Sequence, residues 1–153
     1  MTAWIKRDRG SVSVWVVMFA MITIVLLALL VDGGQAMLEK VRVADIAEQG
    51  ARAAADDVNT RNLRANGTVT LGAGYCGAAT TIVNSYASSA QLGPATTTCN
   101  VPTDPPKDIP ELVSVTVSVP FHPMLQLIFP SFTVTSTESA TVFCGGYDEQ
   151  EAC

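Results

Sequence analysis

The sequence predicts an α+β protein, in which a long N-terminal helix precedes a small domain with one helix and an antiparallel sheet. Two observations lead to this prediction. Residues 12–31 contain no charged residue and are followed by an amphipathic stretch, which together indicate one long helix. Residues 113–119 alternate valine with serine or threonine, as in a strand with one buried face. The 153 residues suffice for one domain of ordinary size.

Charged residues are distributed unevenly around the apolar stretch. Lys6, Arg7 and Arg9 precede it against Asp8, a sum of +2, whereas residues 32–153 contain 6 Lys/Arg and 13 Asp/Glu, a sum of −7. Basic residues beside an apolar span keep that end of a chain in the cytoplasm. We therefore expect residues 1–11 to be a cytoplasmic basic segment and the acidic remainder to be extracytoplasmic. The net charge of −5 gives nucleic-acid binding no electrostatic support.

Residues 12–31 are predicted to be a transmembrane helix in the lipid bilayer. Twenty residues at ~1.5 Å each span about 30 Å, the thickness of the hydrocarbon core. We expect the hydroxyls of Ser13 and Thr23 to bond back to the helix backbone. One alternative is a secretory signal cleaved near Gly33–Ala36, although its apolar core is usually only about 7–15 residues long. The other is a buried core helix, which the apolar residues on all sides disfavour.

Residues 32–66 are predicted to continue as an amphipathic stalk helix. Apolar residues recur there at spacings of three and four, and most of them are alanines that let a partner helix approach closely. Gly33-Gly34 lies between anchor and stalk as a hinge or an interfacial kink, and Asn66 or Gly67 is expected to cap the helix end in the left-handed conformation. The residues expected to pack against other helices are Met37, Val41, Ala44, Ala51 and Ala54.

Residues 67–153 are predicted to form the extracytoplasmic α+β domain. Apolar residues on one face indicate a helix over about 76–91. The proline-rich stretch 93–111 is predicted to be a loop. Residues 112–120 and 132–144 are predicted strands, joined by an apolar connector.

All four cysteines lie on the side of the apolar span where disulfides persist. Four cysteines allow three pairings, and neighbouring pairs are favoured here: Cys76 with Cys99, and Cys144 with Cys153. The alternative is that one or more of them are free buried thiols.

The chain resembles the TadE/TadG-like proteins of Flp (Tad) pilus systems. "RDRGSVSVWVV" and "LLVDGGQAMLEKVRVADIAEQGARAAAD" are similar to the start and the span-to-stalk passage of those proteins, and "VSVTVSVPFHPMLQLIFPSFTVTSTESATV" is similar to their C-terminal strands. The resemblance implies a minor pilin-like (pseudopilin) membrane protein that helps to assemble a thin surface filament used in adhesion. It also implies partners among other pilin-like or pilus-machinery proteins, in homo- or hetero-oligomers formed through the N-terminal helix.

The resemblance also raises the question of peptidase cleavage between Gly10 and Ser11. Pilins of this machinery are cut after a glycine, and Gly10 matches that position. They have a glutamate five residues into the mature chain, whereas here that position is Trp15. The missing charge fits the TadG-type members, which keep an uncut anchor, better than the TadE type.

No catalytic, metal or cofactor site is expected, and we predict that the protein is not an enzyme. His122 is the only histidine, no closely spaced cysteine pair suggests zinc, and no glycine-rich phosphate loop occurs. Two functions compete with pilus assembly. One is a membrane-anchored binding module with no filament role, and the other is a secreted protein released by signal cleavage.

Overall fold

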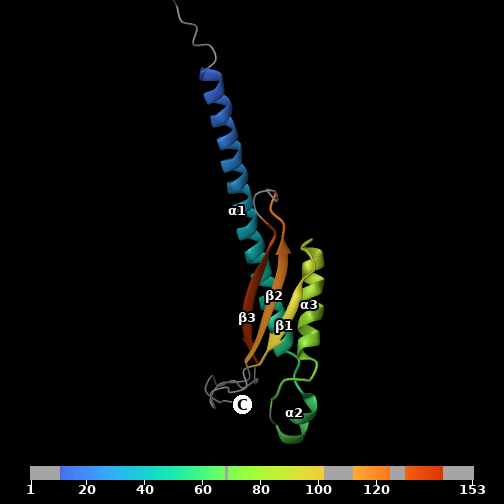
Figure 1. The fold of residues 1–153 in the computed structure, drawn as a ribbon. Coiled ribbons are helices and arrows are strands. Elements are labelled where there is room, and N and C mark those ends of the chain that lie inside the picture. The colour runs from blue at the N-terminus through green and yellow to red at the C-terminus, as the bar shows by residue number, and fades with distance from the viewer. Residues whose placement is uncertain (1–10, 68, 102–111, 125–129, 143–153) are drawn as a thin grey trace, which may run out of the picture.

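The computed structural model describes residues 11–67, 69–101, 112–124 and 130–142. It confirms the α+β class: a long N-terminal helix precedes a small domain with a three-stranded antiparallel sheet (Figure 1). The helices and strands of the described residues are α1 Ser11–Ala55, α2 Thr60–Asn66, α3 Tyr75–Ser89, β1 Thr96–Asn100, β2 Leu112–Phe121 and β3 Phe132–Thr141.

Helix α1 is continuous over its 45 residues, a length of about 68 Å. Its N-terminal half projects beyond the rest of the chain, and its C-terminal half lies along the sheet (Figure 1). The helix passes through Gly33-Gly34 without interruption, and no atom lies within 4 Å of a Cβ built on either glycine. The helix thus continues beyond the apolar stretch as predicted, and the hinge or kink expected at these glycines does not interrupt it.

The helix ends earlier than predicted, because the chain turns at residues 56–59. Val58 forms an isolated antiparallel bridge with Leu71, and the Asn59 N–H donates to the Thr70 carbonyl oxygen at 2.8 Å. The Asn59 side chain then caps α2, where Oδ1 accepts from two backbone N–H groups at 3.2 Å. The predicted single helix over 32–66 is therefore wrong beyond Ala55. Gly67, with φ of 70°, is the expected left-handed cap, but it ends α2.

Three antiparallel strands form the sheet in the order β1-β2-β3. Thr96 pairs with Ser118 across β1 and β2, and Phe121 pairs with Phe132 across β2 and β3. The prediction of a loop throughout 93–111 is wrong at β1. β-Branched threonines suit a strand, and pairing with β2 supplies hydrogen bonds that the proline-rich flanks cannot.

The two faces of the sheet follow the alternation in β2. The valines of β2 face the helices and are fully buried, whereas the serine and threonine hydroxyls point to the other face. On that outer face, three hydroxyl pairs cross from β2 to β3 at 2.8–3.1 Å: Ser114–Ser139, Thr116–Thr137 and Ser118–Thr135. The sheet thus has one apolar face and one hydroxyl-lined face.

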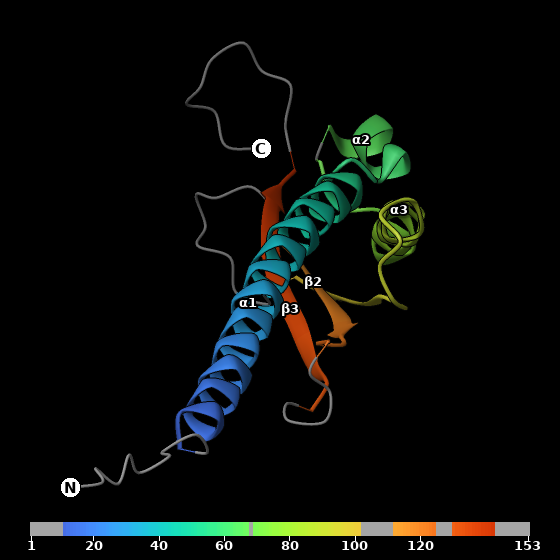
Figure 2. The same ribbon diagram turned by 90° about the horizontal axis from the view of Figure 1, so that it is seen from above.

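Helices α1 and α3 lie against the valine face, and α1 crosses it obliquely (Figure 2). The helix packs closely at Gly50, where an added Cβ would lie 2.9 Å from Val83 Cγ2 and 3.4 Å from Val115 Cγ1. The C-terminal half of α1 is therefore part of the domain core. The larger buried residues of this core are Val43, Ile46, Val83, Val113, Val115, Val117, Val119, Phe121, Val134 and Val142.

Candidate membrane anchor and assembly surface

The projecting half of α1 exposes apolar side chains in every direction. Each valine, leucine, isoleucine, methionine, phenylalanine or tryptophan between residues 12 and 31 is 45–75% exposed. Among the described residues, α1 is the one helix that is long and apolar enough to cross a membrane, and its most apolar stretch is not buried by the rest of the chain. Such a surface is stable only if lipid or another apolar partner covers it.

The Thr23 hydroxyl inside this stretch has its hydrogen-bond partner within the helix. Thr23 Oγ1 donates a hydrogen bond to the Phe19 carbonyl oxygen at 2.8 Å, one helical turn earlier. This confirms the back-bonding expected for Thr23. Because the hydroxyl has an internal partner, its transfer into an apolar medium costs little.

Asp32 marks the end of the apolar stretch and connects it to the sheet. Its side chain faces the rest of the chain, leaving the residue only 6% exposed, and Oδ1 accepts a hydrogen bond from the Met124 backbone N–H at 3.0 Å. The two residues are 92 positions apart. This bond holds the segment after β2 against α1 at the level where the uncharged stretch ends.

Glu39 lies two turns further along the same side of α1 and is partly buried. Desolvation by burial raises the pKa of its carboxyl above the ordinary value, and electrostatic interactions with Arg42 and, less, with His122 oppose this rise. Asp32 and Glu39 thus lie on the side of α1 that the rest of the chain covers at least in part.

The predicted packing residues of the stalk differ in how far the structure exposes them. Met37 is 74% exposed and Val41 is 59% exposed, so both are open to a partner. Ala44 is half-buried. Ala51 and Ala54 are 1% and 0% exposed within the core of the same chain, so the expectation that they contact another subunit is corrected. Their small size serves the packing of α1 on the domain's own sheet and α3.

Sequence reasoning missed the residues that face the sheet. They are Asp32, Ala36, Val43, Ile46 and Gly50, which recur at spacings of three, four or seven. The sequence contains this pattern as well as the pattern of apolar residues that includes Met37 and Val41. Polar Asp32 and small Gly50 concealed it, although both have specific contacts in the fold.

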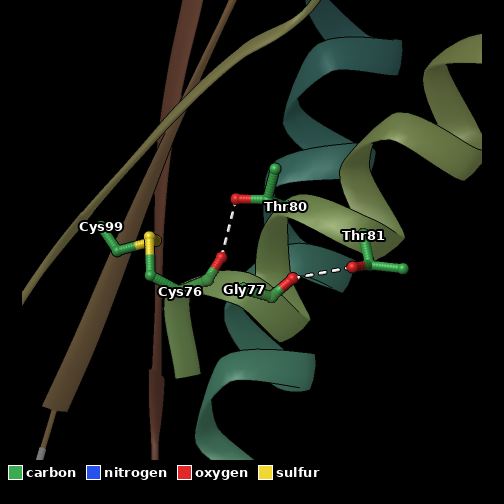
Figure 3. The surroundings of a disulfide bond; sticks show 5 residues. All are labelled: Cys76, Gly77, Thr80, Thr81 and Cys99. Atoms are coloured by element: carbon green, nitrogen blue, oxygen red, sulfur yellow. Dashed lines mark hydrogen bonds between the residues drawn. A yellow bond between two sulfur atoms is a disulfide. The ribbon is translucent and has the colours of Figure 1, made fainter. Parts of the chain in front are cut away.

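A disulfide joins Cys76 of α3 to Cys99 of β1, one of the two favoured pairs (Figure 3). The Cα atoms are 5.7 Å apart, inside the usual range. Next to it, Thr80 Oγ1 donates to the Cys76 carbonyl oxygen at 2.7 Å, and Thr81 Oγ1 donates to that of Gly77 at 2.8 Å. The bond ties the edge strand to the first turn of α3. The other favoured pair, Cys144 with Cys153, lies outside the described residues.

Removing this disulfide is expected to destabilise the domain by about 3 kcal/mol, because the bond closes a loop over a separation of 23 residues. The comparison uses C144A/C153A as the background, with and without C76A/C99A, and measures the free energy of unfolding. A reductant should lower the stability of the background to that of the quadruple variant and leave the latter unchanged. Equal stability of the two oxidised proteins would show that the bond contributes nothing.

The remaining predicted positions concern processing and chemistry. Gly10 lies outside the described residues, and α1 begins at Ser11 directly after it. Within residues 11–67, 69–101, 112–124 and 130–142, no group of three or more histidine, cysteine or acidic side chains is placed to hold a metal ion. The candidate functional surface is the apolar half of α1 together with the side chains next to it.

Comparison with protein families gives a match to the N-terminal helix. No curated protein and no solved structure matches the chain. Residues 10–57 match the model of the family described as "Putative Flp pilus-assembly TadE/G-like". The matched region covers all of α1, starting one residue before it and ending two residues after it. The sequence of α1 is thus similar to the TadE/G-like Flp pilus-assembly family, as the sequence resemblance indicated.

Proposed function

We propose that this protein is a single-pass, minor pilin-like (pseudopilin) subunit that takes part in assembling a Flp/Tad-type surface pilus. The observation that carries the proposal is the exposed apolar half of α1, which lies inside the region matched by the pilus-assembly family. The family match and the candidate membrane helix support a pilus-assembly-related protein. An assembly role of this kind is structural and needs no catalytic site.

In the proposed topology, the N-terminus is cytoplasmic and the α+β domain is extracytoplasmic. Three basic residues precede the apolar stretch, and the acidic remainder follows it. This asymmetry favours retention of the N-terminus inside. The Cys76–Cys99 disulfide is consistent with an oxidising compartment for the domain.

We further propose that α1 contacts other pilin-like helices through the side that points away from the sheet. Val41 is 59% exposed and Leu38 is 53% exposed there, one to three turns beyond the end of the apolar stretch. Charged Asp45, Glu48 and Arg52 continue the same side toward the C-terminal end of α1. The apolar contact would therefore lie close to the membrane, where neighbouring anchors in the bilayer come together.

A charge at Val41 should break this contact. We expect Val41→Arg to reduce co-purification with pilus components at least tenfold, because an arginine there cannot be desolvated against an apolar partner surface without a counter-charge. Membrane insertion should be unchanged, since Val41 lies ten residues beyond the end of the uncharged stretch at Val31. The measurement is the quantity of pilus proteins recovered with the tagged full-length chain from solubilised membranes.

Asn84→Arg is the matched control, because Asn84 is exposed on α3 as Val41 is exposed on α1. This variant should recover pilus components at the wild-type level. If Val41→Arg also recovers them at that level, α1 does not provide the subunit contact. If the wild-type protein recovers none, a membrane-anchored binding module becomes the better interpretation.

A further inference from the structure

An exposed apolar patch lies where the sheet meets the base of the anchor. Met124, just after β2, is 74% exposed, and Phe132, the first residue of β3, is 48% exposed. The Phe132 ring packs on Phe121 with centroids 5.0 Å apart, and Phe121 is almost fully buried. Phe132 therefore rests on the core while half of its ring remains uncovered by the described residues.

A shallow hollow extends this patch onto α1. Gly33, Ala36 and Met37 line it from the helix, and residues 132–135 line it from β3. Its lining is mainly apolar, and Met37 is 74% exposed. Lys40 also lies at the hollow, where its long apolar stem could follow the surface and leave the ammonium group in water or among lipid phosphates. An apolar surface edged by a lysine is typical of the boundary between lipid and water.

The hydrogen bond between Asp32 and Met124 sets the position of this patch along the anchor. Asp32 is the first charged residue after the twenty uncharged residues, so it lies where α1 leaves the hydrocarbon core of a bilayer. The Met124 N–H is 3.0 Å from its carboxylate. The end of the sheet carrying Met124 and Phe132 also lies on the side from which the apolar half of α1 projects (Figure 1). A bilayer around residues 12–31 would therefore meet this patch.

We infer that Met124, Phe132 and Met37 form a membrane-contact surface that rests in the interfacial layer of the same bilayer that holds α1. This inference rests on the proposed transmembrane anchor. Lipid is the expected occupant because the patch adjoins the anchor. The Asp32–Met124 hydrogen bond holds the patch at the level where α1 leaves the hydrocarbon core. The contact, together with the single helix, restricts the tilt of the domain on the membrane and presents a defined side of α1 to neighbouring subunits.

Tryptophan quenching by brominated lipids tests the inference on the full chain in phosphatidylcholine vesicles. The background W4F retains Trp15 in the apolar stretch and reports insertion of the anchor. Three further variants in W4F/W15F each place one indole in the domain: F132W, M124W and T141W. Thr141 is exposed at the opposite end of β3, nine residues or about 30 Å from Phe132, and serves as the matched control.

We expect lipids brominated close to the headgroup to quench F132W and M124W at least threefold more than T141W. Lipids brominated along the acyl chains should quench Trp15, which lies inside the apolar stretch about 10 Å from its middle. Quenching of Trp15 without excess quenching at positions 132 and 124 would overturn the membrane-contact surface and leave the anchor intact. Absence of quenching at Trp15 would overturn the anchor and the surface together. Protection of positions 132 and 124 only when pilus proteins are added would assign the patch to a subunit contact and overturn the inference.

Discussion

Replacing Leu26 and Leu27 with arginine is expected to release the protein from the membrane. Both side chains are 59% exposed in the projecting half of α1, so no described part of the chain covers the new charges. An arginine near the centre of a membrane helix costs about 3 kcal/mol on insertion scales, and two adjacent ones cost about 6 kcal/mol. The fraction of full-length protein that stays in membranes after alkaline extraction should fall from nearly all to a small minority.

The matched control for this experiment is Leu26→Ile with Leu27→Ile, which keeps the size and the apolar character of both side chains. It should remain in the membrane fraction as the wild type does. Retention of the double-arginine variant would mean that the apolar half of α1 is held by something other than lipid. The proposed pilin-like subunit would then need a protein partner that covers the apolar half of α1.

The second large effect is expected at Gly50. The substitution Gly50→Val places a Cβ 2.9 Å from Val83 Cγ2 and 3.4 Å from Val115 Cγ1, with two more methyl groups beyond it. Helix α1 would have to move away from α3 and β2 together, because both contacts lie in the buried core. Overpacking of this kind costs about 3 kcal/mol. For a domain of this size, the melting temperature should fall by about 10 °C or more.

Gly34→Val provides a control in the same helix, because no atom lies within 4 Å of a Cβ at Gly34. Its melting temperature should equal or slightly exceed that of the wild type, since valine has a better helix propensity than glycine. Thermal unfolding of the full chain in detergent, followed by circular dichroism, compares the two variants. Equal melting temperatures would show that α1 does not pack on α3 and β2 as described.

The sequence predicts the elements whose patterns are unambiguous. The valine alternation in β2 gives both the strand and its buried face, and the apolar face of α3 gives a helix within one or two residues of its ends. β1 is not predicted because it is only five residues long and lies in a stretch whose prolines indicate a loop. Its pairing with β2 is a tertiary contact, which no local pattern reveals.

The candidate site is predictable only in part, because one side of α1 is exposed while the other side packs on the sheet. Met37 and Val41 belong to the exposed side of α1, whereas Val43 and Gly50 face the sheet, and each pair fits a helical period. Periodicity alone does not tell which stripe meets the domain. Asp32 stands out in the sequence as the first charge after the apolar stretch, but its partner Met124 is 92 residues away.

The most direct test of the account is the topology of the full-length chain in sealed membrane vesicles of known orientation, digested with protease from one side. The account predicts that protease on the extracytoplasmic side removes a C-terminal tag and leaves an N-terminal tag on a membrane-bound fragment. In vesicles of the opposite orientation, the N-terminal tag should be lost and the folded domain should be protected. Loss of the C-terminal tag only from the cytoplasmic side, or recovery of the whole chain in the soluble fraction, would contradict the account.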